Sequence, residues 1–487
     1  MATRKSIRSR KAIDYAGLDI EVDTTEFASS SSRPVKRRKT TKTATDAEYE
    51  GAASDSDAEV TGTTAAEGIV IPHSRSLHDS DRIKPCLASL LDWYTTVKHT
   101  RGMPWRHEYD ATLDDAAKSQ RAYEVLVSEI MLQQTQVATV VPYYTAWLKR
   151  FPTIRDLAAV EDIEEVNALW KGLGYYRRAS LLLKGAKKVV DDFEGRIPSD
   201  VKVLERDVSA VGRYTAGAVC SIAYGVKAPA VDGNVLRLFS RLLAVHAPLK
   251  SKSVQDIIWD AASVLVSQTD RPGDLNQAFI ELGSTVCKPT SPLCDTCPIQ
   301  KGCGAYLLST SPSEDSIKDL EDACSVCEPF PSAGSSVTRF PMKVTKKKAR
   351  VEASVVTVVR LGPPGPERMV LMSQRPAKGL LAGLWEFPTT DLKEEATLPV
   401  QLEATRSVVV GLDPNLDDEG YTPVVLGSFL HLFSHIRKTY HVVCVDVQSA
   451  EGMELGKNSK WVKVAEFESM NVGKGSEKVW EMILRRK

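Results

Sequence analysis

The spacing of apolar residues changes once along this chain, and the change divides it into two predicted domains. From about residue 83 to 306, apolar residues recur every three or four positions, as in AYEVLVSEIMLQQTQV (122–137), DIEEVNALW (162–170) and SVQDIIWDAASVLV (253–266). This spacing puts the apolar side chains on one face of a helix. The segment is therefore predicted to be a compact all-α domain.

From residue 351 onward the apolar period shortens to two. The runs SVVTVVRL (354–361), RMVLMSQR (368–375), VVLGSFLHLF (424–433) and TYHVVCVDV (439–447) alternate as half-buried strands do. The segments 401–412 and 477–487 read as helices. Residues 351–487 are therefore predicted to form an α+β domain.

The regions outside these two domains have few large apolar residues. Residues 1–82 are rich in Ser, Thr, Ala, Lys and Asp and are expected to be disordered, while residues 307–350 read as a turn-rich linker. The basic run RPVKRRKTTK, Arg33–Lys42, indicates nuclear import or a DNA-binding arm, against a solvated tail. We expect the protein to be located in the nucleus, with the mitochondrion as a second location. No membrane span is expected, since no run approaches the roughly 18 apolar residues required.

The charge and the cysteine content of the chain limit the kinds of ligand that it is expected to bind. The chain has 63 basic and 63 acidic side chains, so nucleic-acid binding would have to be local rather than global. Nine cysteines without a secretory signal favour metal binding or free thiols over disulfides. Four of them, in the pattern C-x6-C-x2-C-x5-C, are Cys287, Cys294, Cys297 and Cys303. Their spacing suits one metal centre, either zinc or a [4Fe–4S] cluster.

A second signal lies upstream, in VKVLERDVSAVGRYTAGAVCSIAYG (201–225). A helix is predicted to end near Asp207 and another to start near Tyr214, joined by the turn Ser-Ala-Val-Gly. The amides of Val211, Gly212 and Arg213 would then point together and could bind a DNA phosphate.

Taken in order, these motifs resemble the helix–hairpin–helix glycosylase superfamily with an iron–sulfur cluster, and most closely its MutY-type adenine DNA glycosylases. The resemblance covers roughly residues 85 to 480. The matching segments are MPWR (103–106), SEIMLQQTQV (128–137), GLGYY (172–176), VGRYTAG (211–217), VDGNV (231–235), LNQAFIELG (275–283), GLLAGLWEFP (379–388) and FSH (433–435). One departure is Ala210, where the family usually has Gly, whose lack of a Cβ suits a positive φ.

The resemblance implies a monomeric enzyme that excises adenine opposite 8-oxoguanine or guanine. Glu129 is the candidate acid for the departing base, because partial burial on its helix would raise its pKa. Asp232, supported by Asn234, would stabilise the sugar cation. Tyr214 stands where endonuclease-III-like relatives carry a Schiff-base Lys, so a glycosylase without strand-nicking activity is expected.

The resemblance also assigns residues that handle the substrate. A base must leave the duplex before this chemistry can occur. Leu132 could wedge into the stack, Gln133 and Gln134 could pair with base edges, and Tyr176, with Tyr175 beside it, could stack. Residues that match the family's adenine pocket are Met103, Trp105, Arg106 and Glu281. The alternative for the aromatic residues is ordinary core packing.

The C-terminal domain resembles a Nudix fold without its catalytic metal site. A Nudix hydrolase needs a Glu-rich helix, whereas residues 398–412 contain one Glu. In the MutY family this domain recognises 8-oxoguanine, and Phe433, Ser434 and His435 match the motif that does so. Ser and His can hydrogen-bond a purine edge.

The linker contains a further pair, Cys324 and Cys327, which is half of a possible zinc site. Animal relatives hold a zinc here with three cysteines and a distant ligand, and Cys86 or an N-terminal histidine could complete it in this chain. The linker could also dock checkpoint or sliding-clamp proteins.

Three other functions compete with the main reading. An endonuclease-III-like enzyme is disfavoured by Tyr214 and by the second domain. A catalytically dead scaffold is disfavoured by Glu129 and Asp232, and a Nudix hydrolase by its missing carboxylates.

Overall fold

The computed structural model describes residues 74–310, 324–328, 336–344, 348–376, 379, 381–393, 395–414, 421–433, 435–450 and 452–485. The basic run Arg33–Lys42 and the side chain of Ser434 lie outside these residues, as does most of the linker proposed to dock partners. Among the described residues, no helix combines the length and apolarity that a bilayer span requires.

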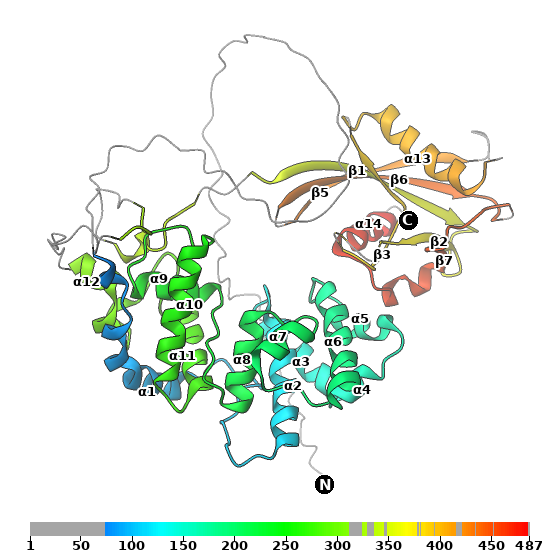
Figure 1. Ribbon diagram of the computed structural model, residues 1–487. Coiled ribbons are helices and arrows are strands. Elements are labelled where there is room, and N and C mark those ends of the chain that lie inside the picture. The colour runs from blue at the N-terminus through cyan, green and yellow to red at the C-terminus, as the bar shows by residue number, and fades with distance from the viewer. Residues whose placement is uncertain are drawn as a thin grey trace, which may run out of the picture. The chain divides into compact units, whose positions relative to one another are not determined.

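The first domain is helical, as predicted (Figure 1). Its helices are α1 (Leu87–Val97), α2 (Asp115–Leu132), α3 (Val137–Arg150), α4 (Ile154–Ala158), α5 (Ile163–Trp170), α6 (Arg177–Phe193), α7 (Val201–Asp207), α8 (Arg213–Tyr224), α9 (Gly233–Leu242), α10 (Lys252–Ser267), α11 (Pro272–Thr285) and α12 (Gly304–Thr310). Short 3-10 turns at Arg75–His78 and Asp81–Cys86 precede α1.

Two hydrophobic clusters build this domain. One gathers α2, α3, α5, α6 and α8 around the fully buried Trp147 and Trp170. The other gathers α1, α9, α10 and α11 around Phe239 and Phe279, whose rings meet edge to face. Helix α8 packs against α2 on one side and α11 on the other, so it joins the two clusters. The candidate acid on α2 and the candidate aspartate before α9 therefore come from different clusters.

Glycines let the segment between α8 and α9 run close to its neighbours. A Cβ on Gly217 of α8 would lie 2.0 Å from the Pro229 carbonyl oxygen, and one on Gly283 of α11 would lie 2.9 Å from that of Asn234. Real Cβ atoms do not approach backbone so closely. The two glycines thus fix the path of the chain on either side of Asp232.

The second domain is a mixed sheet with a helix on each face. Its elements are β1 (Arg350–Leu361), β2 (Met369–Gln374), β3 (Trp385–Glu386), β4 (Thr389–Leu392), α13 (Leu398–Leu412), β5 (Thr422–Leu432), β6 (Ile436–Val447), β7 (Ser459–Lys463) and α14 (Lys474–Leu484). The strand order is β3-β2-β1-β6-β5, with β1 parallel to β6, β4 paired to β1 and β7 paired to β2.

The alternation of apolar side chains between the two faces of β1 explains why a helix packs on each face of the sheet. Val355 and Val359 belong to clusters that include α13, whereas Val356 and Val358 belong to the cluster that includes α14. The strand is thus buried on both faces, as its continuous apolar run requires.

Several predicted boundaries were wrong. Helical spacing continues through Val137, but α2 ends at Leu132 and α3 starts at Val137, because Gln134 adopts a positive φ of 55°. Described structure begins at residue 74, before the expected boundary at 83. Part of the expected linker is also packed: Phe340 is fully buried against Ala244 and Ala305.

Candidate active site

Glu129 is a buried carboxyl with a phenol partner. It lies on α2 and is 9% exposed, and Tyr214 Oη on α8 donates a hydrogen bond of 2.6 Å to Glu129 Oε2. The pKa of Glu129 is raised to about 7, chiefly by burial; the hydrogen bond from Tyr214 opposes this rise and the charge of Asp232 adds to it. Glu129 can therefore hold a proton near neutral pH, as a general acid must.

Asp232 caps the start of α9. Its Oδ1 accepts a hydrogen bond of 2.8 Å from the Val235 amide, and its Oδ2 accepts one of 2.8 Å from Asn234 Nδ2. Burial raises the pKa of Asp232, while these donors lower it. The predicted Asp–Asn pair is therefore in contact, and the amide hydrogen bonds stabilise the carboxylate form.

Arg237 links this pair to the first cluster cysteine, and it was not predicted from the sequence. Arg237 Nη2 donates to Asn234 Oδ1 at 3.0 Å and to the Gly283 carbonyl at 2.6 Å, and its Nε donates to the Cys287 carbonyl at 3.1 Å. An Arg one turn after the Asn of VDGNV was the available sequence signal.

The four predicted cluster cysteines line one cavity. The other lining residues include Leu238, Leu242 and Val286. Arg241, only 2% exposed, donates from Nη1 to Cys287 Sγ at 3.2 Å. A convergent set of thiols in an apolar pocket beside a cation fits a cluster ligated by thiolates.

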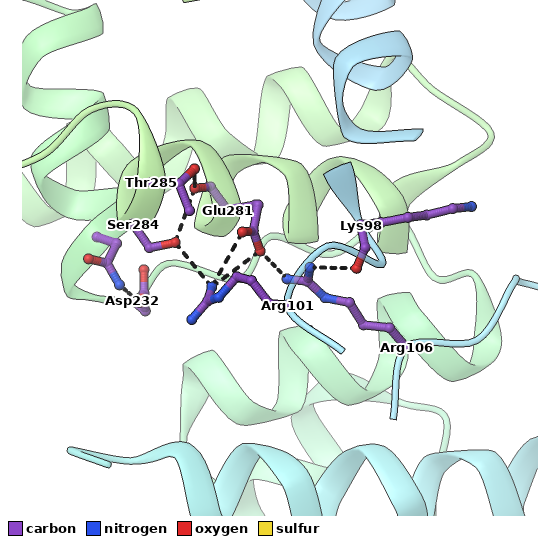
Figure 2. A network of polar contacts seen from close by, with 8 residues as sticks. Lys98, Arg101, Arg106, Asp232, Glu281, Ser284 and Thr285 are labelled. Atoms are coloured by element: carbon purple, nitrogen blue, oxygen red, sulfur yellow. Dashed lines mark hydrogen bonds and ion pairs between the residues drawn. The ribbon is translucent and has the colours of Figure 1, made fainter. Parts of the chain in front are cut away.

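Glu281 lies between two arginines (Figure 2). It is 2% exposed, and its Oε2 pairs with Arg106 Nη2 at 2.6 Å and with Arg101 Nη1 at 3.3 Å. Arg106 and Glu281, both assigned to the adenine pocket from the sequence, are therefore in direct contact. Arg101 was missed, although it stands two residues before the MPWR segment.

The other predicted pocket residues are largely buried. Met103 and Trp105 belong to the same hydrophobic cluster as α2, and the Trp105 ring meets Tyr144 edge to face at 5.1 Å. The Trp105 carbonyl also accepts a hydrogen bond from Arg121. Their packing is therefore compatible with either the core or a pocket wall.

The hairpin adopts the turn that the sequence put in doubt. Ala210 takes a positive φ of 73° despite its Cβ. The Val211 amide donates to the Val208 carbonyl at 3.2 Å, so in this structure it is used inside the turn, and its contact with a phosphate stays a prediction. Gly212 and Arg213 are exposed at the start of α8, and the Arg213 guanidinium lies 3.9 Å from the centre of the Trp259 ring.

Two loops carry the predicted base-contacting residues. Gln133 and Gln134 are exposed after α2, and Leu132 is half-buried. In the loop before α6, Tyr175 is 52% exposed at a φ of 49°, whereas Tyr176 is 8% exposed and its Oη accepts from the Gly172 amide at 3.2 Å. The ring of Tyr176, which was predicted to stack on a base, is therefore buried in this structure, whereas the ring of Tyr175 is exposed, and the stacking role stays a prediction.

A second group of side chains that could hold a metal ion consists of two linker cysteines and a histidine from the turn before α1. His78 Nε2 is 3.1 Å from Cys324 Sγ and 3.5 Å from Cys327 Sγ. His78 Nδ1 is 2.8 Å from the Leu243 carbonyl, which leaves Nε2 toward the two thiols. The three ligand atoms lie within 4.8 Å of one another. An N-terminal histidine was one of the two expected partners, and Cys86 was the other.

The predicted 8-oxoguanine motif lies at the turn between β5 and β6. The Phe433 amide donates to the Ile436 carbonyl at 2.8 Å and closes this turn. The Phe433 ring meets His431 at 4.5 Å, and His435 is exposed. His431, which is half-buried, was not predicted.

Two family models match the chain. One, described as "HhH-GPD superfamily base excision DNA repair protein", matches residues 127–262, and one described as "NUDIX domain" matches residues 365–482. Both confirm the fold predicted from the sequence.

Known proteins with similar sequences share one name. The adenine DNA glycosylase of Mus musculus is 40% identical over 417 residues, covering 81% of this chain and 77% of the relative. That of Homo sapiens is 38% identical over 417 residues, covering 81% and 73%. Among solved structures, a thermostable thymine-DNA glycosylase is 27% identical and covers 46% of this chain and 96% of its own, with a TM-score of 0.39.

Proposed function

This chain belongs to the adenine DNA glycosylase family, and on that premise we propose that it excises adenine mispaired with 8-oxoguanine or guanine, leaving the strand intact. It is a DNA glycosylase of base excision repair. The observation that carries the proposed mechanism is a protonatable Glu129 held by Tyr214 within electrostatic reach of Asp232.

Glu129 supplies the proton and Asp232 the negative charge. As the bond between adenine and deoxyribose breaks, the base gains electrons and the sugar loses them. A protonated Glu129 can donate to a ring nitrogen of adenine, while the Asp232 carboxylate stabilises the developing sugar cation. Asn234 holds the Asp232 carboxylate in place through its hydrogen bond.

Tyr214 is the reason to expect no strand nicking. Its phenol cannot form an imine with the sugar, whereas an amine at this position could. In this structure it orients the acid instead, through the bond to Glu129 Oε2.

Contacts with DNA are assigned to exposed residues. Gly212 and Arg213 are suited to a phosphate, Gln133 and Gln134 to base edges. We assign the stacking role to Tyr175 rather than to the buried Tyr176, because an exposed ring can reach a base without unfolding its loop. At the other domain, His435 and Phe433 are the described members of the 8-oxoguanine motif.

The four cysteines are proposed to hold a [4Fe–4S] cluster. Cys287, Cys294, Cys297 and Cys303 line one cavity, and when bound the cluster would cross-link the loop that Arg237 and Arg241 contact. Its proposed role here is structural support of the loop.

His78, Cys324 and Cys327 are proposed to hold zinc with a fourth ligand. A neutral imidazole whose Nδ1 faces a carbonyl presents its Nε2 as a ligand, and the two thiols form a C-x2-C pair. When bound, zinc would tie the linker to the segment before α1.

Zinc content tests this second site. The purified wild-type chain is expected to contain one zinc ion, and Cys324→Ser with Cys327→Ser should lose it while the iron content stays constant. Cys86→Ser is the control and should retain zinc. Equal zinc in the double variant and the wild type would exclude this ligand set.

The function itself is tested on a duplex with adenine opposite 8-oxoguanine. Free adenine should appear, with strand breaks only after alkali and no adduct trapped by borohydride. Intact substrate would refute the proposed function, and breaks without alkali would refute its monofunctional form. His435→Ala should reduce the preference for 8-oxoguanine over guanine opposite adenine.

A further inference from the structure

Arg178, on the first turn of α6, is buried in an unusual environment. Its side chain is 7% exposed. It donates hydrogen bonds to six oxygens, and each of these oxygens is neutral. A buried charge is costly unless its donors are satisfied. The large number of neutral partners around Arg178 therefore needs a physical explanation.

The bonds from Nη1 hold the end of α2 and the loop after it. Nη1 lies 3.0 Å from the Ile130 carbonyl, 2.9 Å from that of Met131 and 2.6 Å from that of Gln133. The last carbonyls of a helix have no partner within the helix and carry a partial negative charge. The guanidinium satisfies them and ends the helix just before the exposed Gln133 and Gln134.

The bonds from Nη2 reach a second loop as well. Nη2 lies 3.4 Å from the Leu173 carbonyl and 3.1 Å from that of Gly174, and 3.2 Å from Thr135 Oγ1 in the first loop. The guanidinium also lies 5.4 Å from the centre of the Tyr175 ring. One planar group therefore joins loop 132–136 to loop 172–176.

Both loops contain a strained residue beside these contacts. Gln134 has a φ of 55° and Tyr175 a φ of 49°, a region that side chains with a Cβ rarely adopt. Such conformations persist only where surrounding contacts fix them. For each loop, the carbonyl of the preceding residue, Gln133 or Gly174, is bound by Arg178.

We propose that Arg178 is a positioning residue that fixes the two loops in one arrangement, so that Gln134 and Tyr175 meet the DNA together. This inference rests on the proposed function, since it is those two side chains to which DNA contacts are assigned. Arg178 itself lies beneath the loops and touches no substrate. Its guanidinium geometry is essential, because a lysine has one nitrogen and cannot reach both sets of carbonyls.

Hydrogen–deuterium exchange of the free protein tests the positioning. Arg178→Met and Arg178→Lys should each raise exchange at least about tenfold in both loops and leave α8 and α11 protected. Lys184→Met, which removes an exposed charge from the same helix, should change neither loop. Unchanged exchange, or a rise confined to one loop, would overturn the proposal.

DNA binding tests the consequence. Arg178→Lys should raise the Kd for a duplex with adenine opposite 8-oxoguanine at least about tenfold, and the pH limbs of the single-turnover rate should not move, because Glu129 is untouched. Faster exchange in both loops with an unchanged Kd would refute joint presentation to DNA. A wild-type protein that fails to excise adenine would refute the proposed function instead, while the exchange result would still decide whether Arg178 holds the loops.

Discussion

At the scale of single residues, the proposed reaction uses two carboxyl groups, Glu129 and Asp232, which have different surroundings and different tasks. Glu129 is packed into the α2–α8 interface and meets one phenol, so burial dominates and raises its pKa to about 7. Asp232 is also buried, but two amide donors face its oxygens and favour the charged form. Glu129, which meets a phenol, is therefore the proposed acid, and Asp232, whose oxygens accept two hydrogen bonds, is the proposed anion.

The rate of excision is expected to follow a bell-shaped pH profile. Glu129 must be protonated, so the rate should fall as the pH rises through about 7. Asp232 must be ionised, and because its pKa is raised, the rate should also fall toward acid. Single-turnover rates between about pH 4 and about pH 9 measure both limbs. Glu129→Gln should be slower by at least about 100-fold, and a wild-type rate that is flat across neutral pH would contradict the acid role.

Ala210 gives a stability prediction at one residue. An L-residue at a φ of 73° is strained, and glycine is not. Ala210→Gly should raise the free energy of unfolding by about 1 kcal/mol in urea titration. Ala159, at an ordinary φ of −71°, is the control, and its change to Gly should destabilise the protein. A loss of stability in Ala210→Gly would show that the turn is not strained.

At the scale of helices and loops, contacts between neighbouring elements set the position of the proposed catalytic residue Asp232. The segment between α8 and α9 is held by Gly217 and Gly283, and by Asn276, which donates to the Ala228 carbonyl at 2.8 Å and accepts from the Ala230 amide at 3.0 Å. These residues touch no reacting atom, yet they set the place of Asp232.

Gly283→Ala is therefore expected to disturb catalysis from the neighbouring helix. The new Cβ would press on the backbone of Asn234 and shift the carboxylate that Asn234 supports. The single-turnover rate should fall by about 100-fold, with a smaller change in Kd for DNA. Gly411→Ala on α13, where a Cβ meets nothing within 4 Å, is the matched control. Equal rates for Gly283→Ala and the wild type would show that the close approach is not needed.

Element types could be read from the sequence more readily than element ends or polar networks. The apolar periodicity of α2, α10, β1 and β6 extends over many residues, so these helices and strands occur where they were predicted. The end of α2 could not be predicted, because the apolar spacing continues to Val137 and because the carbonyls at the break accept hydrogen bonds from Arg178, which is distant in the sequence. The sequence also did not identify Arg237, Arg101 or His78. A lone charged or titratable residue cannot be distinguished from a solvated one in the sequence until its partners are known.

At the scale of the whole molecule, the chain combines two domains with separate tasks. The helical domain contains the proposed acid, the proposed anion and the four cysteines, and the sheet domain contains the turn at Phe433 and His435. The family of the chain was predictable because its motifs are specific and occur in order. The zinc group was predicted only in part, since its histidine lies more than 240 positions from its cysteines, at a separation of 246 from Cys324.

The most direct test of the account is the single-turnover rate of Asp232→Asn on a duplex with adenine opposite 8-oxoguanine, measured together with Kd. Asparagine also caps helices, so α9 should persist while the charge is lost. Asp114→Asn, the same change at the N-cap of α2, controls for the cap. The account predicts DNA binding near that of the wild type and a rate lower by at least about 1,000-fold for Asp232→Asn only. A rate for Asp232→Asn equal to that of Asp114→Asn would contradict it.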